Sequence, residues 1–181
     1  MNGLPHQSQP SRFNRAWAGK RAGTALPLLA AILAWPLAAW AEPQGGGVKQ
    51  GDATISVGGS QTTIDQRSGK AIIDWQKFGL DAHESAVFNQ PGSNAIALNR
   101  VTGGDPSNIL GAIRANGQVW LVNRNGVMFG KSATVDVHGL VATTADIPNA
   151  SFMADDFNFS LPATDPAAAV ANEGTLSFGA R

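Results

Sequence analysis

Short runs of apolar and β-branched residues, separated by Gly and Asn, make up the chain from about residue 52 onward. Runs of this kind with turn residues between them are typical of β-strands. No stretch of ten or more residues has the periodicity of an amphipathic helix, and only residues 105–108 and 151–156 resemble the start of a helical turn. The pattern therefore predicts an all-β protein. The expected strands are 54–57, 62–65, 70–75, 87–89, 95–101, 109–113, 118–123, 127–129, 134–137, 140–144 and 170–172.

Two all-β plans fit this pattern. A β-sandwich has strands of alternating apolar and polar positions at intervals of roughly 8–12 residues. A β-solenoid has Asn-Gly-type corners and β-branched residues that face inward. The pairs 116–117, 125–126 and 138–139 read Asn-Gly, Asn-Gly and His-Gly, and they lie 9 and 13 residues apart with one strand per corner. This spacing favours the solenoid slightly, and the sandwich stays open at this point.

The amino end has the three parts of an export signal in the required order. Residues 1–23 carry four Lys and Arg and no acid, residues 25–41 are apolar and uncharged, and this run ends in Ala-Trp-Ala, which suits a signal peptidase. We predict export by the Sec machinery and cleavage between Ala41 and Glu42. The alternative is an uncleaved membrane anchor, but the run contains two prolines and is shorter than the roughly 20 residues of a spanning helix.

Charge and cysteine content exclude several classes of function. The whole chain has 13 Lys and Arg and 13 Asp and Glu, and without residues 1–41 these become 9 and 13, a net charge of −4. An acidic chain with no basic run does not fit nucleic-acid binding, which depends on neutralising phosphates. The sequence contains no cysteine, so disulfides and thiol chemistry are excluded. The part after the signal is long enough for one domain with a hydrophobic core.

Residues 117–130 form the most informative segment and read Gly-Gln-Val-Trp-Leu-Val-Asn-Arg-Asn-Gly-Val-Met-Phe-Gly. This segment resembles the amino-terminal secretion domain of filamentous haemagglutinin-like exoproteins, the passengers of two-partner secretion, which carry an Asn-Pro-Asn-Gly-Ile-type motif. The secretion motif here is Asn123, Arg124, Asn125, Gly126 and Val127. The resemblance covers about residues 51–160, because further segments match in the family's order. These segments are 73–78, 88–91, 97–103, 105–111 and 139–144.

Arg124 stands where the family usually has Pro. Pro fixes φ near −65° and suits a turn, whereas Arg permits the same turn without enforcing it, so we expect a softer corner and weaker recognition by a partner. Asn99 and Arg100 are the candidate secondary motif, with Asn99 in an amide ladder between coils and Arg100 facing solvent. The family's second motif, Asn-Pro-Asn-Leu, has only a poor counterpart at 89–92.

The resemblance implies both a fold and a role. The family fold is a right-handed parallel β-helix, a β-solenoid, with an amino-terminal β cap that protects the first strand edge. Family members are exported through the periplasm of Gram-negative bacteria and are recognised, still extended, by an outer-membrane β-barrel transporter with periplasmic domains. They then fold outside and are secreted or stay at the cell surface. We therefore expect a non-enzymatic secretion domain of an adhesin-like exoprotein, without a cofactor, whose host or cell-surface ligands bind a downstream region.

Aromatic residues are expected to serve packing. We place Trp75, Phe78, Phe88, Trp120 and Phe129 in the core or the cap, and carbohydrate stacking by Trp75 is the alternative for that residue.

No metal site or catalytic residue is expected. His83 and His138 are far apart without ligand spacing, and Asp155-Asp156 is an isolated acidic pair that fits a solvated loop. The alternative function is a polysaccharide-acting β-helix lyase or hydrolase, since such enzymes share the fold. That chemistry needs clustered carboxylates, and the acids here are scattered.

The expected organisation has four parts. Residues 1–41 are the signal peptide, 42–51 a flexible lead, 52–160 the secretion domain, and 161–181 the start of a further coil. Exoproteins of the family are usually far longer, so two alternatives stay open: the sequence is a fragment or truncated gene product, or the domain acts alone.

Overall fold

The computed structural model describes residues 43–179, so the predicted signal peptide and its cleavage site at Ala41 and Glu42 lie outside the described residues. The described part is almost entirely β-structure, with one short helix, α1 (Asn149–Met153). None of its helices has the length and apolar character needed to cross a membrane. The strands are β1 (Gly47–Gln50), β2 (Ala53–Gly58), β3 (Gln61–Gln66), β4 (Lys70–Trp75), β5 (Ser85–Asn89), β6 (Ile96–Val101), β7 (Ser107–Ile109), β8 (Ala112–Ala115), β9 (Gln118–Asn123), β10 (Val127–Phe129), β11 (Thr134–Val137), β12 (Gly139–Thr143), β13 (Val170–Asn172) and β14 (Thr175–Phe178).

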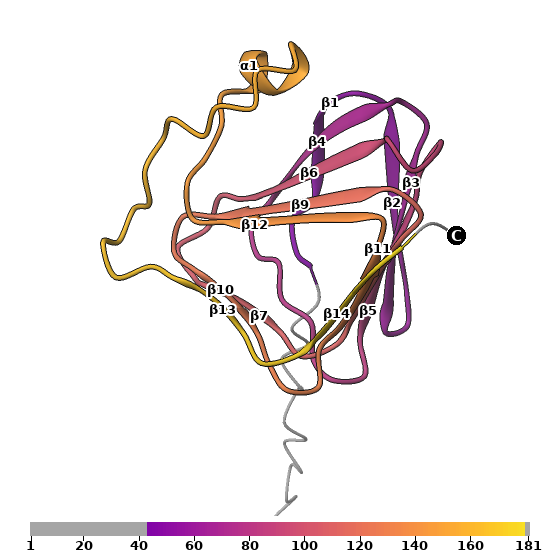
Figure 1. The fold of residues 1–181 in the computed structure, drawn as a ribbon. Helices are drawn as coiled ribbons and strands as arrows, with labels where there is room; N and C mark the ends of the chain where they lie inside the picture. Colours follow the sequence, from indigo (N-terminus) through magenta and orange to yellow (C-terminus); the bar gives the residue numbers. More distant parts are fainter. Residues whose placement is uncertain (1–42, 180–181) are drawn as a thin grey trace, which may run out of the picture. The chain divides into compact units, whose positions relative to one another are not determined.

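The strands stack into three sheets that form the faces of a β-solenoid of about three turns (Figure 1). Sheet A has the order β14-β11-β8-β5-β3-β2, sheet B the order β1-β4-β6-β9-β12, and sheet C the order β13-β10-β7. Successive coils pair in parallel, for example β4 with β6 and β6 with β9. The predicted parallel β-helix is confirmed, and the sandwich alternative is wrong.

Two antiparallel strands cap the amino end of the solenoid. β1 pairs with β4, and β2 forms a hairpin with β3, so the first coil does not present its strand edges directly. The predicted amino-terminal β cap is therefore present. Residues 47–50 were assigned to a flexible lead, and that assignment is wrong, because they form β1. The short sequence of β1 shows little local preference for a strand, and its partner β4 lies more than twenty residues further along the chain.

One expected strand is divided by a corner. The run 109–113 reads as a single strand, but β7 ends at Ile109 and β8 begins at Ala112. The chain turns at Gly111. This residue passes so close to the carbonyl oxygens of Glu84 and Asp81 that even a Cβ atom would overlap them. Residues 105–108 were a candidate helical turn, but Ser107 opens β7; the other candidate, 151–156, overlaps α1.

Apolar side chains from all three sheets fill the interior of the solenoid. Trp75, Phe78, Phe88 and Phe129 belong to this core and are at most 2% exposed, as predicted for aromatic packing. Carbohydrate stacking by Trp75 is excluded, because its side chain is enclosed. Trp120 is also buried, but it lies outside the solenoid on sheet B.

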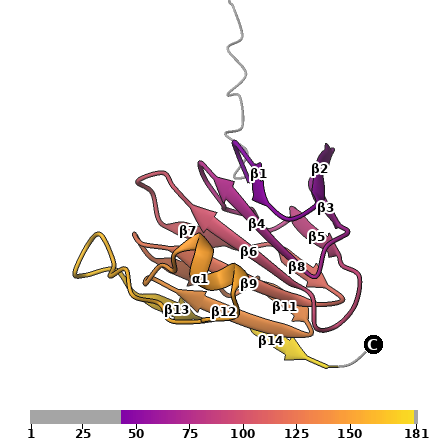
Figure 2. The same ribbon diagram turned by 90° about the horizontal axis from the view of Figure 1, so that it is seen from above.

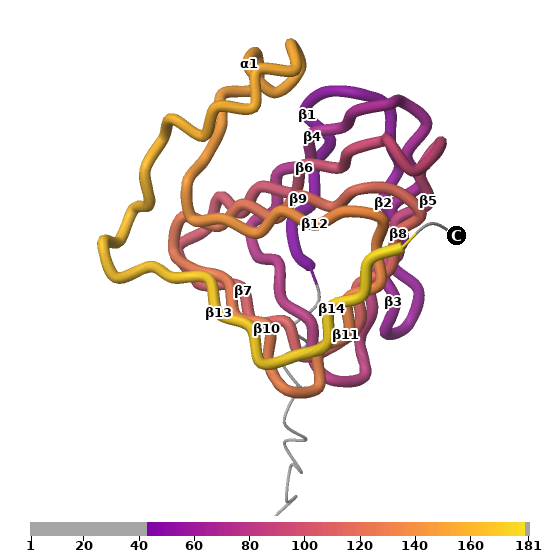
Figure 3. Tube along the Cα trace, in the orientation of Figure 1, coloured from indigo at the N-terminus to yellow at the C-terminus, as the bar shows by residue number. Residues whose placement is uncertain are grey.

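A long excursion interrupts the last coil between β12 and β13. We call residues 144–169 the strap; it is the orange loop of Figure 3 and it carries α1. An antiparallel bridge between Asp146 and Leu161 closes its neck. The strap covers the outer face of sheet B, so side chains on both faces of β6 and β9 are buried.

Candidate functional site

The secretion motif forms the corner between β9 and β10. Asn123 ends β9 with its side chain fully buried. Its Nδ2 donates to the carbonyl oxygen of Asp105 and to Oγ of Ser107, both at 3.0 Å. Its Oδ1 accepts from the backbone N–H of Asn125 at 2.9 Å. The side chain therefore joins its own turn to the corner of the preceding coil.

Asn125 and Gly126 complete the turn. Nδ2 of Asn125 donates to the carbonyl oxygen of Gly103 at 2.9 Å, and the N–H of Gly126 donates to the carbonyl oxygen of Asn123 at 3.0 Å. Gly126 has φ of 121°, a conformation that other residues rarely adopt. Its carbonyl oxygen accepts from the N–H of Ser107 at 3.0 Å. These hydrogen bonds hold the corner at residues 123–126 against the corner at residues 103–107 of the preceding coil.

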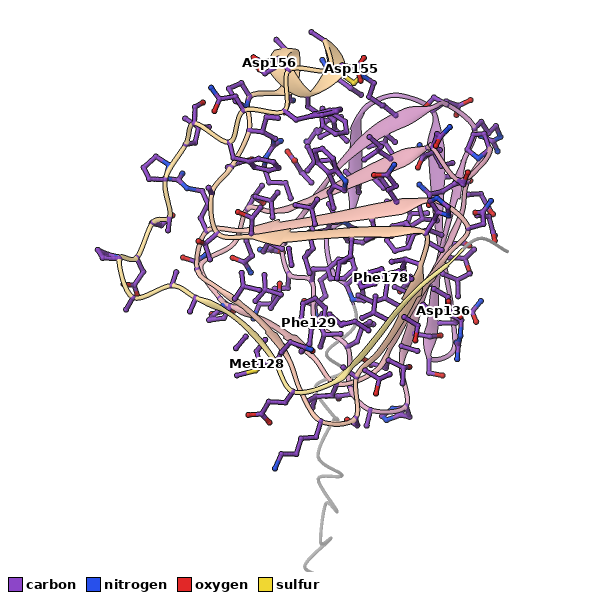
Figure 4. The ribbon with its side chains drawn as sticks, viewed as in Figure 1. Met128, Phe129, Asp136, Asp155, Asp156 and Phe178 are labelled. Atoms are coloured by element: carbon purple, nitrogen blue, oxygen red, sulfur yellow. The ribbon has the colours of Figure 1, made fainter. Side chains whose placement is uncertain are left out.

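After the turn the chain resumes its inward and outward alternation. Val127 and Phe129 are 2% and 1% exposed, whereas Met128 between them is 37% exposed. Figure 4 shows Phe129 directed into the solenoid and Met128 away from it. Val127 pairs with Ser107 of the previous coil and with Val170 of the next. The last motif residue is therefore a core position that depends on the turn before it.

The side chain of Arg124 reaches the strap. Its Nε donates to the carbonyl oxygen of Pro162 at 2.8 Å, and its own carbonyl oxygen accepts from the N–H of Thr164 at 3.0 Å. The residue that replaces the family's Pro is thus tied to the strap on both its side-chain and its backbone atoms.

Asn99 and Arg100 do not behave as the sequence predicts. Asn99 is fully buried inside the solenoid, but its neighbours in the adjacent coils are Ile73 and Leu121, so there is no amide ladder. Its Oδ1 instead accepts from the indole N–H of Trp75 at 3.0 Å. Its Nδ2 donates to the carbonyl oxygens of Ala97 at 3.1 Å and Trp120 at 3.4 Å, so the core satisfies this polar side chain with partners that sequence spacing does not reveal.

Arg100 does not face solvent, because the strap covers it. Its side chain is only 13% exposed and forms ion pairs with Asp74 at 3.2 Å and Asp146 at 2.8 Å. Nη1 also donates to Oδ1 of Asn149 at 2.8 Å, and Nη2 to the carbonyl oxygen of Ile147 at 2.7 Å. A cavity of about 250 Å³ lies between Arg100, Arg124 and Asn125. The structure therefore brings Arg100 beside the secretion motif, while Asn99 points to the other side of β6.

Three residues that hold the strap were missed by sequence reasoning: Lys70, Asp146 and Phe152. The hydrogen bonds from Lys70 to the carbonyl oxygens of Phe152 and Met153 and from Arg100 to Asp146 span 46 to 83 positions, so no local spacing marks these residues. Asp155 and Asp156, at the tip of the strap in Figure 4, are exposed, and Asp155 forms an ion pair with Lys70 at 2.7 Å. Within residues 43–179, no three His, Asp or Glu side chains gather as metal ligands would.

The family model of the TPS secretion domain, where TPS stands for two-partner secretion, matches residues 39–181. The chain belongs to this family. The two-partner secretion domain of this chain is also similar to the crystal structure of the HMW1 secretion domain from Haemophilus influenzae. The TM-score is 0.70 and the identity 36%, over 74% of this chain and 36% of that one.

Two curated relatives support the same assignment. A heme/hemopexin-binding protein of Haemophilus influenzae strain Rd is 44% identical over 109 residues, which are 60% of this chain and 12% of that protein. A second protein of that name from Haemophilus influenzae is 43% identical over 98 residues, 54% of this chain and 11% of that protein. The chain thus spans about an eighth of the length of these relatives. The matches support a secretion domain and do not support the alternative of a polysaccharide-acting enzyme.

Proposed function

We propose that this chain addresses an exoprotein to an outer-membrane β-barrel transporter and then nucleates β-helix folding outside the cell. Membership of the two-partner secretion family implies such a transporter as the partner. The family's route leads through the periplasm, in keeping with the export signal that the sequence predicts. The observation that carries the proposal is the burial of Asn123, whose side chain bonds the motif's corner to the corner of the preceding coil.

Burial restricts when a transporter has access to the motif. Asn123 is 0% exposed and all its polar atoms are engaged within the turn and the neighbouring corner. A partner that reads this side chain therefore has to bind before the third coil folds. This order agrees with recognition of an extended chain, in which strand addition to a sheet edge is a plausible mode.

The same contacts suit the motif to its second task. Once Asn123 and Asn125 bond to the corner formed by residues 103–107, β10 is held in register on β7. Each coil added afterwards buries apolar surface on the previous one, with strands spaced about 4.8 Å apart. In the proposed function, the turn at residues 123–126 therefore sets the position from which further coils stack.

A secretion assay with Asn125→Ala separates recognition from folding. We expect less protein outside the cell and more in the periplasm when this variant is produced with the cognate transporter. Asn108→Ala is the matched control, because Asn108 lies on β7 of the neighbouring coil with an exposed side chain. Removing the transporter should abolish secretion of the unchanged chain. Normal secretion of Asn125→Ala together with reduced stability would mean that the motif only shapes a turn.

The export signal remains a proposal that mass spectrometry can test. We expect the protein recovered outside the cytoplasm to begin at Glu42, because Ala39-Trp40-Ala41 has small residues where signal peptidase requires them. Ala41→Leu should slow this cleavage, whereas Ala38→Leu, outside those positions, should not. An intact Met1 in the exported protein would contradict cleavage.

A further inference from the structure

The strap reaches back across the solenoid to the first coil. It leaves sheet B at the end of β12, the last strand of that sheet in the described chain. Its tip, α1, nevertheless contacts Lys70 of β4, more than eighty residues earlier. Figure 2 shows α1 lying over the strands of sheet B. The strap therefore spans coils that differ widely in their position along the chain.

Lys70 holds the tip of the strap. Its Nζ donates to the carbonyl oxygens of Phe152 at 3.2 Å and Met153 at 2.8 Å, at the carboxyl end of α1, where a cation is favourable. The same Nζ lies 5.9 Å and 5.8 Å from the ring centroids of Phe152 and Phe157 and pairs with Asp155. One lysine of the first coil thus engages four residues of the strap.

The next two coils contribute one basic residue each. Arg100, in β6, binds the outgoing arm of the strap through Asp146, Ile147 and Asn149. Arg124, after β9, binds the returning arm at the carbonyl oxygen of Pro162. With Lys70, three consecutive coils therefore each present one cation to the strap.

The same three coils also contribute apolar side chains that contact the strap. Beneath the strap lie buried outer-face side chains from three coils: Ile72 of β4, Leu98 of β6, and Trp120 and Val122 of β9. The strap contributes Phe152, which is 0% exposed and meets the ring of Trp120 edge-on at a centroid distance of 5.5 Å.

Trp120 is the centre of an aromatic cluster. Beyond Phe152, it contacts Phe157 with centroids 4.8 Å apart and Phe159 with centroids 5.8 Å apart. Its indole N–H is buried and has no acceptor among residues 43–179, so the strap packs on the ring through apolar contacts. The strap thus closes a site that exists only after β4, β6 and β9 have stacked.

We propose that the strap is a latch, which closes over sheet B after the first three coils have stacked and opens again as a separate unit. Its residues follow all three coils in the sequence, so its docking site is built before it arrives. Much of the strap, including residues 153–158, is exposed, and few of its backbone groups take part in sheets, so its opening requires less free energy than unfolding of the solenoid. Opening uncovers Leu98 and Trp120 beside Lys70 and Arg100, while the solenoid interior stays closed.

Hydrogen exchange followed by mass spectrometry on the purified chain tests the latch without any transporter, so its outcome is independent of the proposed function. Unchanged protein should show faster exchange at the bonded amides of Asp146, Leu161 and Thr164 than at those of β7 and β10. In Phe152→Ala we expect at least about tenfold faster exchange across the strap, with β7 and β10 unaffected.

Two further variants keep the test decisive. Ile113→Ala removes a fully buried side chain from the solenoid interior and should accelerate exchange in the strap and the sheets together. Lys70→Gln keeps most of the packing and should accelerate exchange only around α1, so it serves if Phe152→Ala fails to fold. The latch would be refuted if the strap and sheet C exchanged with the same rate in the unchanged protein, or if Phe152→Ala or Lys70→Gln accelerated both equally.

Discussion

Replacing Asn123 by Ala is expected to destabilise the folded chain by about 3 kcal/mol, because a buried side chain that links two corners is lost. The change removes the bonds from Nδ2 to Asp105 and Ser107 and the bonds that Oδ1 accepts from Asn125. The carbonyl oxygen of Asp105 and Oγ of Ser107 then lose their donor, and Asn125 loses the acceptor that shapes the turn. Urea unfolding followed by circular dichroism measures the loss.

The matched control for this prediction is Asn108→Ala. Asn108 pairs with Met128 in the sheet that the motif leads into, but its side chain is exposed, so we expect a change within about 0.5 kcal/mol. Equal unfolding midpoints for Asn123→Ala and Asn108→Ala would show that the buried amide contributes nothing to the stability of the corner.

Replacing Gly103 by Ala is expected to cost about 3 kcal/mol or to prevent folding, because a methyl group has no room there. A Cβ atom on Gly103 would overlap the carbonyl oxygen of Gln76, a backbone atom of the preceding coil that has no rotamer to move away. The carbonyl oxygen of Gly103 also accepts the bond from Asn125, so a displaced backbone would disturb the secretion motif. Thermal unfolding measures the effect.

Gly104 supplies the control for this second prediction. A Cβ atom on Gly104 would meet nothing within 4 Å, so Gly104→Ala should change stability by no more than about 0.5 kcal/mol. The same substitution at adjacent positions thus isolates the close approach between coils. If both variants unfolded at the same temperature, close contact at residue 103 would not limit the stacking of the corners.

Both predictions concern contacts between the corner of one coil and the corner of the next. The motif residues Asn123 and Asn125 bond to the preceding corner, whereas Arg124 bonds to the strap that arrives later. The corner at residues 123–126 therefore contacts both the preceding coil and the strap. A substitution there affects stacking, strap closure and, in the proposed function, recognition, so stability and secretion have to be measured on the same variants.

Local features of the fold were predictable from the sequence. The corners at 116–117 and 125–126 each separate two strands as expected, because the tendency of Asn and Gly to turn the chain is a property of the residues themselves. At 138–139 only His138 separates the strands, because Gly139 already begins β12. Most strand positions followed for the same reason, since alternation and β-branching act within a few residues. The run 109–113 was misjudged because its corner arises from the close passage of Gly111 against residues 81–84, not from its own sequence.

The sequence by itself determined that this chain is built of short strands joined by tight corners, and the resemblance at residues 117–130 indicated the family. Only the tertiary structure decided that Asn99 bonds to Trp75, that Arg100 is buried against Asp74 and Asp146, and that a strap covers sheet B. The physical reason is the range of the interactions. A turn is decided by adjacent residues, whereas the hydrogen bonds of coil stacking and strap docking join residues from 16 to 83 positions apart, whose pairing no local pattern encodes.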